Sequence, residues 1–271
     1  MPELPEIVCR AREMRGELTG RTLRDIEVRQ PKCLNVSVCL FRKALIGGKI
    51  RDVSQHGKWI IVETTDGYLL LNLGMGGELL LVPSDDLPGK WRVRLEFDDG
   101  RSLAINFWWF GHAHYAPVGG LRDHTLLATL GPNALDVSPG AFRELLEGRR
   151  SRVKSFLLDQ KRIAGIGNAY VHDILFRAGL HPLRTIPTLR EEEIEALHSA
   201  IRVEFERSIE KGGAYYELDV HGRPGGFSGD DLLVGYREGR PCPRCGAMIE
   251  KIQTGSTSSF ICPACQPLVR S

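Results

Sequence analysis

Two closely spaced pairs of cysteines near the end of the chain restrict its fold more than any other feature. Two residues lie between Cys242 and Cys245, Cys262 and Cys265 repeat that spacing, and sixteen residues lie between the pairs. Each pair can place two thiolates on one side of a tight turn, and two pairs complete a tetrahedral zinc shell. The pattern predicts one structural Zn²⁺ that holds a hairpin at about 248–260. A redox dithiol would not explain two equal pairs.

The composition is that of a globular protein in a reducing compartment. The chain has 271 residues, 42% of them hydrophobic, and a net charge of only +2, so any basic surface must be local. One local run, at 149–154, reads Arg-Arg-Ser-Arg-Val-Lys, which fits a solvated helix face more often than a phosphate site. No membrane span or signal peptide is expected. Three scattered cysteines beside one metal site favour the cytoplasm.

The first residues suggest covalent chemistry. The chain begins Met1-Pro2-Glu3. If Met1 is removed, Pro2 presents a secondary amine that can attack a sugar aldehyde carbon and form an iminium. Glu3 places a carboxyl group one residue away. An N-terminal nucleophile in a chain that also carries a zinc module suggests a reaction on nucleic acid.

The pattern of apolar residues changes along the chain. Pro5 can begin a helix whose apolar positions run from Ile7 to Leu18. Short alternating runs up to about residue 107 flank Asp-Gly turns at 66–67 and 99–100, which predicts hairpins in a β-sandwich or barrel. After residue 133 the pattern becomes helical, with candidates at about 141–147, 153–158, 169–178 and 189–209.

Three further motifs each fit an ordinary role as well as a functional one. Glycines in Gly165-Ile166-Gly167-Asn168 would let a phosphate approach the backbone, but a plain helix–helix turn also explains them. Lys58 starts an apolar strand, where a lysine is usually just exposed. Trp108, Trp109 and Phe110 are consecutive, so in a strand they cannot all enter one core, and at least one should be exposed or bind something flat.

Together these motifs resemble the formamidopyrimidine-DNA glycosylase/endonuclease VIII family over nearly the whole chain. The resemblance rests on the start Pro2-Glu3-Leu4-Pro5-Glu6, on Lys58, and on the four terminal cysteines. It also rests on the runs at 73–77, 131–132 and 165–170. It implies an α+β protein with an N-terminal helix and β-sandwich (1–132), a helix–two-turn–helix domain (133–232) and a zinc finger (233–271).

The resemblance also implies a reaction and roles for residues. The family removes oxidised bases from DNA and cleaves the strand by β,δ-elimination. Pro2 would attack C1′ of a flipped nucleotide, and Glu3 would act as general acid. Lys58 and Asn168 look like phosphate contacts, and Met75 like the residue that fills the space of the extruded base. The loop at 222–227 matches a segment that can cover that base.

Two departures from the 8-oxoguanine branch affect residues that read DNA. Where that branch has Asp-Pro-Arg-Arg-Phe-Gly, this chain has Asn-Phe-Trp-Trp-Phe-Gly at 106–111. Trp108 and Trp109 therefore replace two arginines, and Phe110 is kept. In the zinc hairpin, Thr257 stands where the family carries an arginine. We therefore expect the lyase chemistry to be retained with a changed lesion preference.

Two other functions remain open at this stage. The chain could be a binding protein for damaged or abasic DNA that excises bases poorly, which the loss of the hairpin arginine favours. It could also be a zinc-ribbon interaction module joined to a β-sandwich, which would leave the N-terminal motif unexplained. The expected partner is damaged DNA, without a membrane, and the expected state is a monomer.

Overall fold

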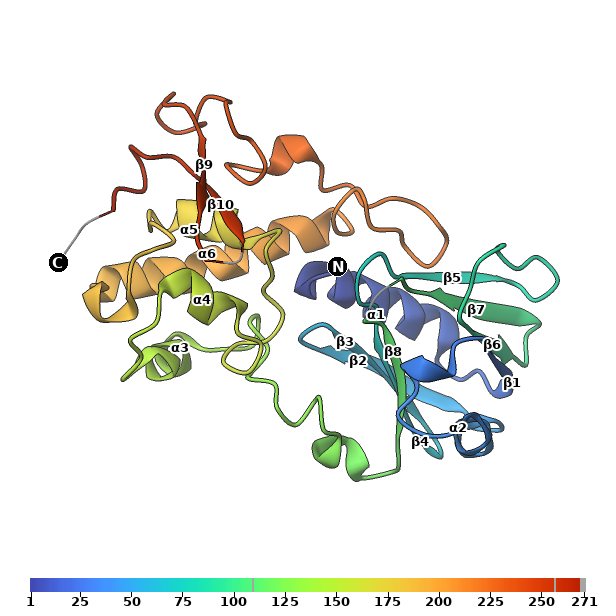
Figure 1. The fold of residues 1–271 in the computed structure, drawn as a ribbon. Coiled ribbons are helices and arrows are strands. Elements are labelled where there is room, and N and C mark those ends of the chain that lie inside the picture. Colours follow the sequence, from blue (N-terminus) through green and yellow to red (C-terminus); the bar gives the residue numbers. More distant parts are fainter. Residues whose placement is uncertain (109, 256, 269–271) are drawn as a thin grey trace. The chain divides into compact units, whose positions relative to one another are not determined.

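The computed structural model describes residues 1–108, 110–255 and 257–268. The chain forms two compact units, one of residues 1–129 and 209–226 and the other of residues 130–208 and 227–271 (Figure 1). We call them the N-terminal unit and the helical unit. The predicted α+β architecture of helix, β-sandwich, helical domain and zinc module is confirmed, whereas the boundaries at 132 and 232 stay predictions.

The N-terminal unit is a sandwich of two four-stranded antiparallel sheets. Both contribute apolar side chains to one core, because alternate residues of each strand point inward. One sheet has the order β1 (Leu23–Val28), β6 (Val93–Phe97), β7 (Arg101–Asn106), β5 (Glu78–Pro83). The other has the order β2 (Ile50–His56), β3 (Trp59–Thr64), β4 (Gly67–Asn72), β8 (His112–Ala116). A short helix α2 (Val38–Leu45) follows the 3-10 turn at Pro31–Cys33.

Helix α1 (Leu4–Leu18) packs against β2 and β3. Its buried face carries Ile7, Ala11, Met14 and Leu18, which are the positions that helical spacing predicted. The two predicted Asp-Gly hairpins are also present, because β3 pairs with β4 around Asp66 and β6 pairs with β7 around Gly100.

The helical unit contains four α-helices and the zinc hairpin among its described residues. The helices are α3 (Pro139–Leu146), α4 (Val153–Leu158), α5 (Val171–Arg177) and α6 (Glu191–Glu210), of which the last ends as the chain re-enters the N-terminal unit. Strands β9 (Glu250–Gln253) and β10 (Ser258–Ile261) form the hairpin. A small core with Phe176, Val234 and Phe260 joins it to α5. Within the described ranges, no helix is both long enough and apolar enough to span a bilayer.

Candidate active site and zinc centre

Pro2 and Glu3 lie at the start of α1, and both are buried. Glu3 is the N-cap residue and forms a reciprocal capping box with Glu6, in which the Glu3 N–H donates to Glu6 Oε2 at 2.9 Å. The second oxygen of Glu6 accepts the N–H of Ala214 at 3.1 Å. These hydrogen bonds in the first turn of the helix therefore fix the backbone of Pro2 and Glu3, the predicted nucleophile and acid.

Residues 211–226 follow the long helix α6 in the chain but belong to the N-terminal unit, where they lie along α1. We call them the return segment. Four α1 side chains, spaced by four, three and four residues on one helix face, hold it. Glu6 accepts from Ala214, Arg10 donates to the carbonyls of Gly212 and Leu218, Glu13 accepts from the Val220 N–H, and Glu17 contacts His221. The predicted role of the loop at 222–227 as a cover for the flipped base stays a prediction.

The return segment also brings a third acidic residue to the chain start. Glu217 Oε1 lies 3.9 Å from the Met1 amino nitrogen, and the Glu217 side chain is only 12% exposed. Burial raises the pKa of the Glu217 carboxyl to about 7, and the nearby Glu6 and Glu3 act in the same direction. The amino terminus and Arg10 oppose that rise. The sequence gives no local signal for this acid, because the partners lie 216 positions apart in the chain.

Three predicted DNA contacts of the N-terminal unit lie in linked loops. Lys58 is half-buried in the turn between β2 and β3. Asn72 ties that turn to the next loop, because its amide donates to the Lys58 carbonyl at 3.1 Å and its oxygen accepts from Gly74 at 3.0 Å. The carbonyl of Met75 accepts the N–H of Trp108 at 3.4 Å. One hydrogen-bonded series therefore links Lys58, Met75 and Trp108.

Trp108 and Phe110 lie in a loop, not in a strand. Strand β7 ends at Asn106, and Phe110 has a positive φ of 58°, which a strand does not allow. Trp108 is 68% exposed and Phe110 is 79% exposed, so both offer flat faces to solvent. Strand alternation therefore does not apply to Trp108 and Phe110, and the prediction that at least one of the aromatic residues is exposed is confirmed. Trp109 lies outside the described residues.

The predicted glycine turn of the helical unit precedes α5. Gly165 and Gly167 are buried, and Gly165 has φ +108°, which favours glycine. The side chain of Gln160 organises the turn, because its oxygen accepts from Gly165 at 2.9 Å and its amide donates to the Ile166 carbonyl at 2.7 Å. Asn168 Oδ1 is buried without a hydrogen-bond partner among the described residues. A polar atom in this state can accept a hydrogen bond from a ligand or water.

The four cysteines converge as their spacing predicted. Their sulfur atoms all lie within 4.8 Å of one another, with Cys242–Cys265 at 3.9 Å and Cys245–Cys262 at 3.5 Å. Tetrahedral zinc with Zn–S bonds of about 2.3 Å needs sulfurs about 3.8 Å apart. The N–H groups of Arg244 and Cys265 point at the sulfurs of Cys242 and Cys262, each at 3.4 Å. The donor set fits one structural Zn²⁺.

Family models match three successive parts of the chain. They are the formamidopyrimidine-DNA glycosylase N-terminal domain at 1–106, the H2TH domain of the same enzyme at 130–218, and the zinc finger found in FPG and IleRS at 239–268. The chain belongs to the formamidopyrimidine-DNA glycosylase family. The predictions of this family, of a DNA glycosylase/AP lyase enzyme and of one structural zinc are confirmed.

Relatives of this glycosylase match over its whole length. The formamidopyrimidine-DNA glycosylase of Syntrophotalea carbinolica is 36% identical over 280 residues, covering 98% of this chain and 100% of the relative. That of Chloroflexus aggregans is 36% identical over 279 residues and covers 100% of both. A Lactococcus lactis Fpg solved with abasic-site DNA superposes with a TM-score of 0.90 at 29% identity, covering 98% of this chain and 99% of that one.

Sequence reasoning missed two clusters in this glycosylase. In the N-terminal unit, His112 stacks on Trp59 with ring centroids 5.7 Å apart, and His114 Nδ1 lies 2.9 Å from His124 Nε2. His124 Nδ1 accepts the Leu127 N–H, so its Nε2–H donates to His114. Burial lowers the pKa of His114 to about 4, and the neighbouring histidines add to this shift. The cluster is therefore neutral near pH 7.

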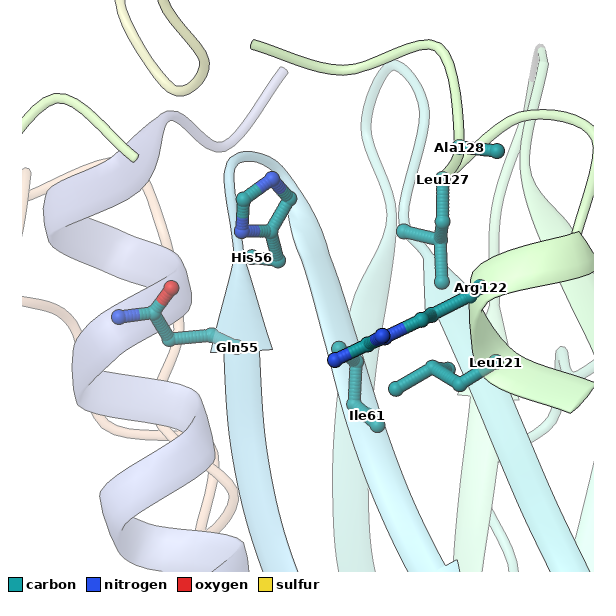
Figure 2. A pocket seen from close by; sticks show the side chains of 7 residues that line it. All are labelled: Gln55, His56, Ile61, Leu121, Arg122, Leu127 and Ala128. Atoms are coloured by element: carbon teal, nitrogen blue, oxygen red, sulfur yellow. The ribbon is translucent and has the colours of Figure 1, made fainter. Parts of the chain in front are cut away.

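An open hollow also lies in the N-terminal unit. Figure 2 shows the side chain of His56 at the end of β2 and that of Arg122 in front of β3, near Ile61. Its other lining residues are Gln55, Ile61, Leu121, Leu127 and Ala128.

The second missed cluster lies in the helical unit. The run at 149–154 was expected to be a solvated face, yet Lys154 is 3% exposed. Its ammonium contacts four oxygens of the zinc hairpin. The interpretation of the run as a solvated face was wrong for this residue. The hairpin lies about 100 residues further along the chain, so no local pattern could signal the contact.

Proposed function

We propose that this glycosylase excises damaged bases from DNA through a Schiff base on Pro2, after removal of Met1, and cleaves the strand by β,δ-elimination. The placement of Pro2 and Glu3 at the rigid start of α1 carries the proposal. The Pro2 nitrogen attacks C1′, the bond from C1′ to the base breaks, and the base leaves with the electron pair. The amine then loses its proton as the iminium forms, and Glu3 protonates the sugar oxygen when the ring opens.

The iminium makes the later steps possible because it withdraws electrons from C2′. Loss of a C2′ proton expels the 3′ phosphate, and a further elimination expels the 5′ phosphate. The relatives support a DNA substrate, since one Lactococcus lactis structure holds abasic-site DNA and another holds DNA with N7-benzyl-Fapy-dG. The proposed DNA contacts are Lys58, Met75, Trp108, Trp109, Phe110, Gly165, Gly167 and Asn168. The monomeric state and the cytoplasmic location also stay predictions.

Borohydride trapping tests the nucleophile, because borohydride reduces an iminium to a stable amine. The protein should crosslink to DNA with an abasic site. A form with one extra residue before Pro2 should crosslink far less, whereas Pro2→Gly keeps a primary amine and should retain some crosslinking. Equal trapping by the extended form would assign the nucleophile to a lysine. Trapping without excision on a panel of lesions would favour the alternative function, a protein that binds damaged DNA, which the threonine at 257 also supports.

We further propose a lesion preference that differs from that of 8-oxoguanine enzymes. An arginine can donate two hydrogen bonds to one base, which discriminates by about 1–3 kcal/mol, whereas an indole stacks on any base. The exposed rings of Trp108 and Phe110 support stacking. We therefore expect little preference for the opposite base and better cleavage of unpaired substrates. Cleavage of one lesion in single-stranded DNA and opposite each of the four bases measures this. A strong requirement for cytosine would refute it.

A further inference from the structure

The helical unit holds a buried positive charge beneath the tip of the zinc hairpin. Lys154 Nζ lies 2.7 Å from the Ser258 carbonyl oxygen and 2.8 Å from Ser259 Oγ. It lies 3.0 Å from Thr257 Oγ1 and 3.1 Å from Thr254 Oγ1. An ammonium has three hydrogens for these four acceptors, so all its donors are used within the hairpin. Every acceptor is a neutral oxygen.

No carboxylate balances this charge among the described residues. Lys154 forms no ion pair there, and burial is the cause that lowers the pKa of its ammonium to about 8. The ammonium is still mainly protonated at neutral pH. His172, which packs on Phe260 of the same hairpin, adds no charge, because burial and the Lys154 charge lower its pKa to about 3. Among the described residues, the Lys154 ammonium is therefore surrounded by neutral oxygens and has no paired carboxylate.

The hydroxyl groups around Lys154 divide into a buried and a half-exposed layer. Ser259 is 1% exposed, whereas Thr254 and Thr257 are half-exposed. The Thr254 hydroxyl can donate to the Thr257 carbonyl at 3.0 Å or to Ser259 at 2.7 Å. Thr257 Oγ1 accepts from Lys154, and its own hydrogen has no acceptor in the part of the chain that the structure describes. That hydrogen is available to an incoming anion.

We propose that Lys154 and Thr257 together form a phosphate site on the zinc hairpin, with Thr257 donating to a DNA phosphodiester and Lys154 supplying the charge behind it. Thr257 is the position at which the chain lacks the arginine expected in the hairpin. One arginine would provide both charge and donor. Here the two properties come from different residues, and the charge stays below the surface. This inference rests on the proposed binding of DNA.

The test measures binding to a duplex that contains a tetrahydrofuran abasic analogue, by fluorescence anisotropy over a series of KCl concentrations. Lys154→Met keeps most of the buried chain and removes the charge. We expect affinity to fall about tenfold or more, as for a hydrogen bond with a charged partner. The salt slope should fall by about one unit. Thr257→Val should weaken binding severalfold at an unchanged slope. Lys43→Met, which removes an exposed charge from α2, is the matched control.

The Lys154 ammonium also fastens the hairpin to α4. If that is its only role, Lys154→Met should lose affinity together with zinc, and a cation returned to the hairpin surface should not restore the affinity. Zinc content is therefore measured for each variant, and the double variant Lys154→Met/Thr257→Arg returns a cation to the hairpin surface. Recovery of affinity and slope by the double variant, with about one zinc per chain, would support the phosphate site.

Wild-type affinity and slope in Lys154→Met would overturn the inference, as would a loss that follows zinc loss and that Thr257→Arg does not reverse. If the wild-type protein fails to bind this DNA at all, the proposed function fails as well, so the two failures are distinguishable.

Discussion

Replacing Glu217 with glutamine tests whether the N-terminal unit buries an ionisable acid beside its first residues. The Glu217 side chain is 12% exposed, and burial is the main cause that raises the pKa of its carboxyl from 4.5 to about 7. A carboxyl with a higher pKa in the folded chain stabilises the fold while it is protonated. That contribution is complete below pH 4.5 and is lost as the pH rises through about 7. The full loss corresponds to roughly 3 kcal/mol.

Glu217→Gln removes this titration, because the amide stays neutral at every pH. The variant should therefore gain stability over the wild type as the pH rises from 5 to 8, by up to roughly 3 kcal/mol. Urea unfolding followed by tryptophan fluorescence measures the difference in free energy of unfolding. All four tryptophans precede residue 110, so the signal reports on the N-terminal unit alone. This matters because two units need not unfold in one step.

Glu27→Gln is the matched control, since the Glu27 side chain is 46% exposed and pairs with Arg29 at the surface. Its effect on stability should be small and nearly the same at pH 5 and pH 8. The reasoning about Glu217 fails if the stability difference between Glu217→Gln and the wild type does not change between these two pH values. It also fails if the glutamine variant is the less stable protein at pH 8.

Three further outcomes are expected. Lys58→Ala should lower the salt slope of DNA binding by about one unit on every sequence, and an unchanged slope would place Lys58 away from the DNA. Cys262→Ser should reduce zinc below about one per chain and weaken DNA binding, so metal-free protein with intact binding would contradict the zinc assignment. Asp173 is buried and accepts the N–H groups of residues 233–235 at 2.7–2.9 Å. Asp173→Asn should destabilise the helical unit by roughly 1.5–3 kcal/mol, and zinc release at the same urea concentration as in the wild type would argue against this.

Local patterns predicted much of this fold because local physical chemistry determines them. Pro5 and the apolar spacing of α1 specify a helix at the start, and Asp66-Gly67 specifies a hairpin turn. The cysteine spacing specifies the metal site in the same local way, because two tight turns, each with two cysteines, supply all four ligands.

The predictions that failed or were missing depend on contacts between distant parts of the chain. Lys154 is buried by strands that come about 100 residues later, and Glu217 meets the amino terminus only in the folded unit. The sequence around Trp108 and Phe110 shows neither that β7 stops at Asn106 nor that Phe110 has a positive φ, so strand alternation is no guide there. A short stretch of sequence shows neither the residue at which a strand stops pairing nor the distant residues that will bury a given side chain.

The return segment has a consequence for how the protein is made. Residues 211–226 belong to the same unit as residues 1–129, and they bind α1 through Glu6, Arg10, Glu13 and Glu17. During synthesis the ribosome must therefore produce about four-fifths of the chain before the unit that contains Pro2 can be completed. A fragment that stops at residue 129 leaves the α1 face uncovered, and a separately expressed 211–226 peptide should bind to that fragment. The amino terminus thus reaches its final setting late in translation, after the residues of α3 to α6 have been synthesised.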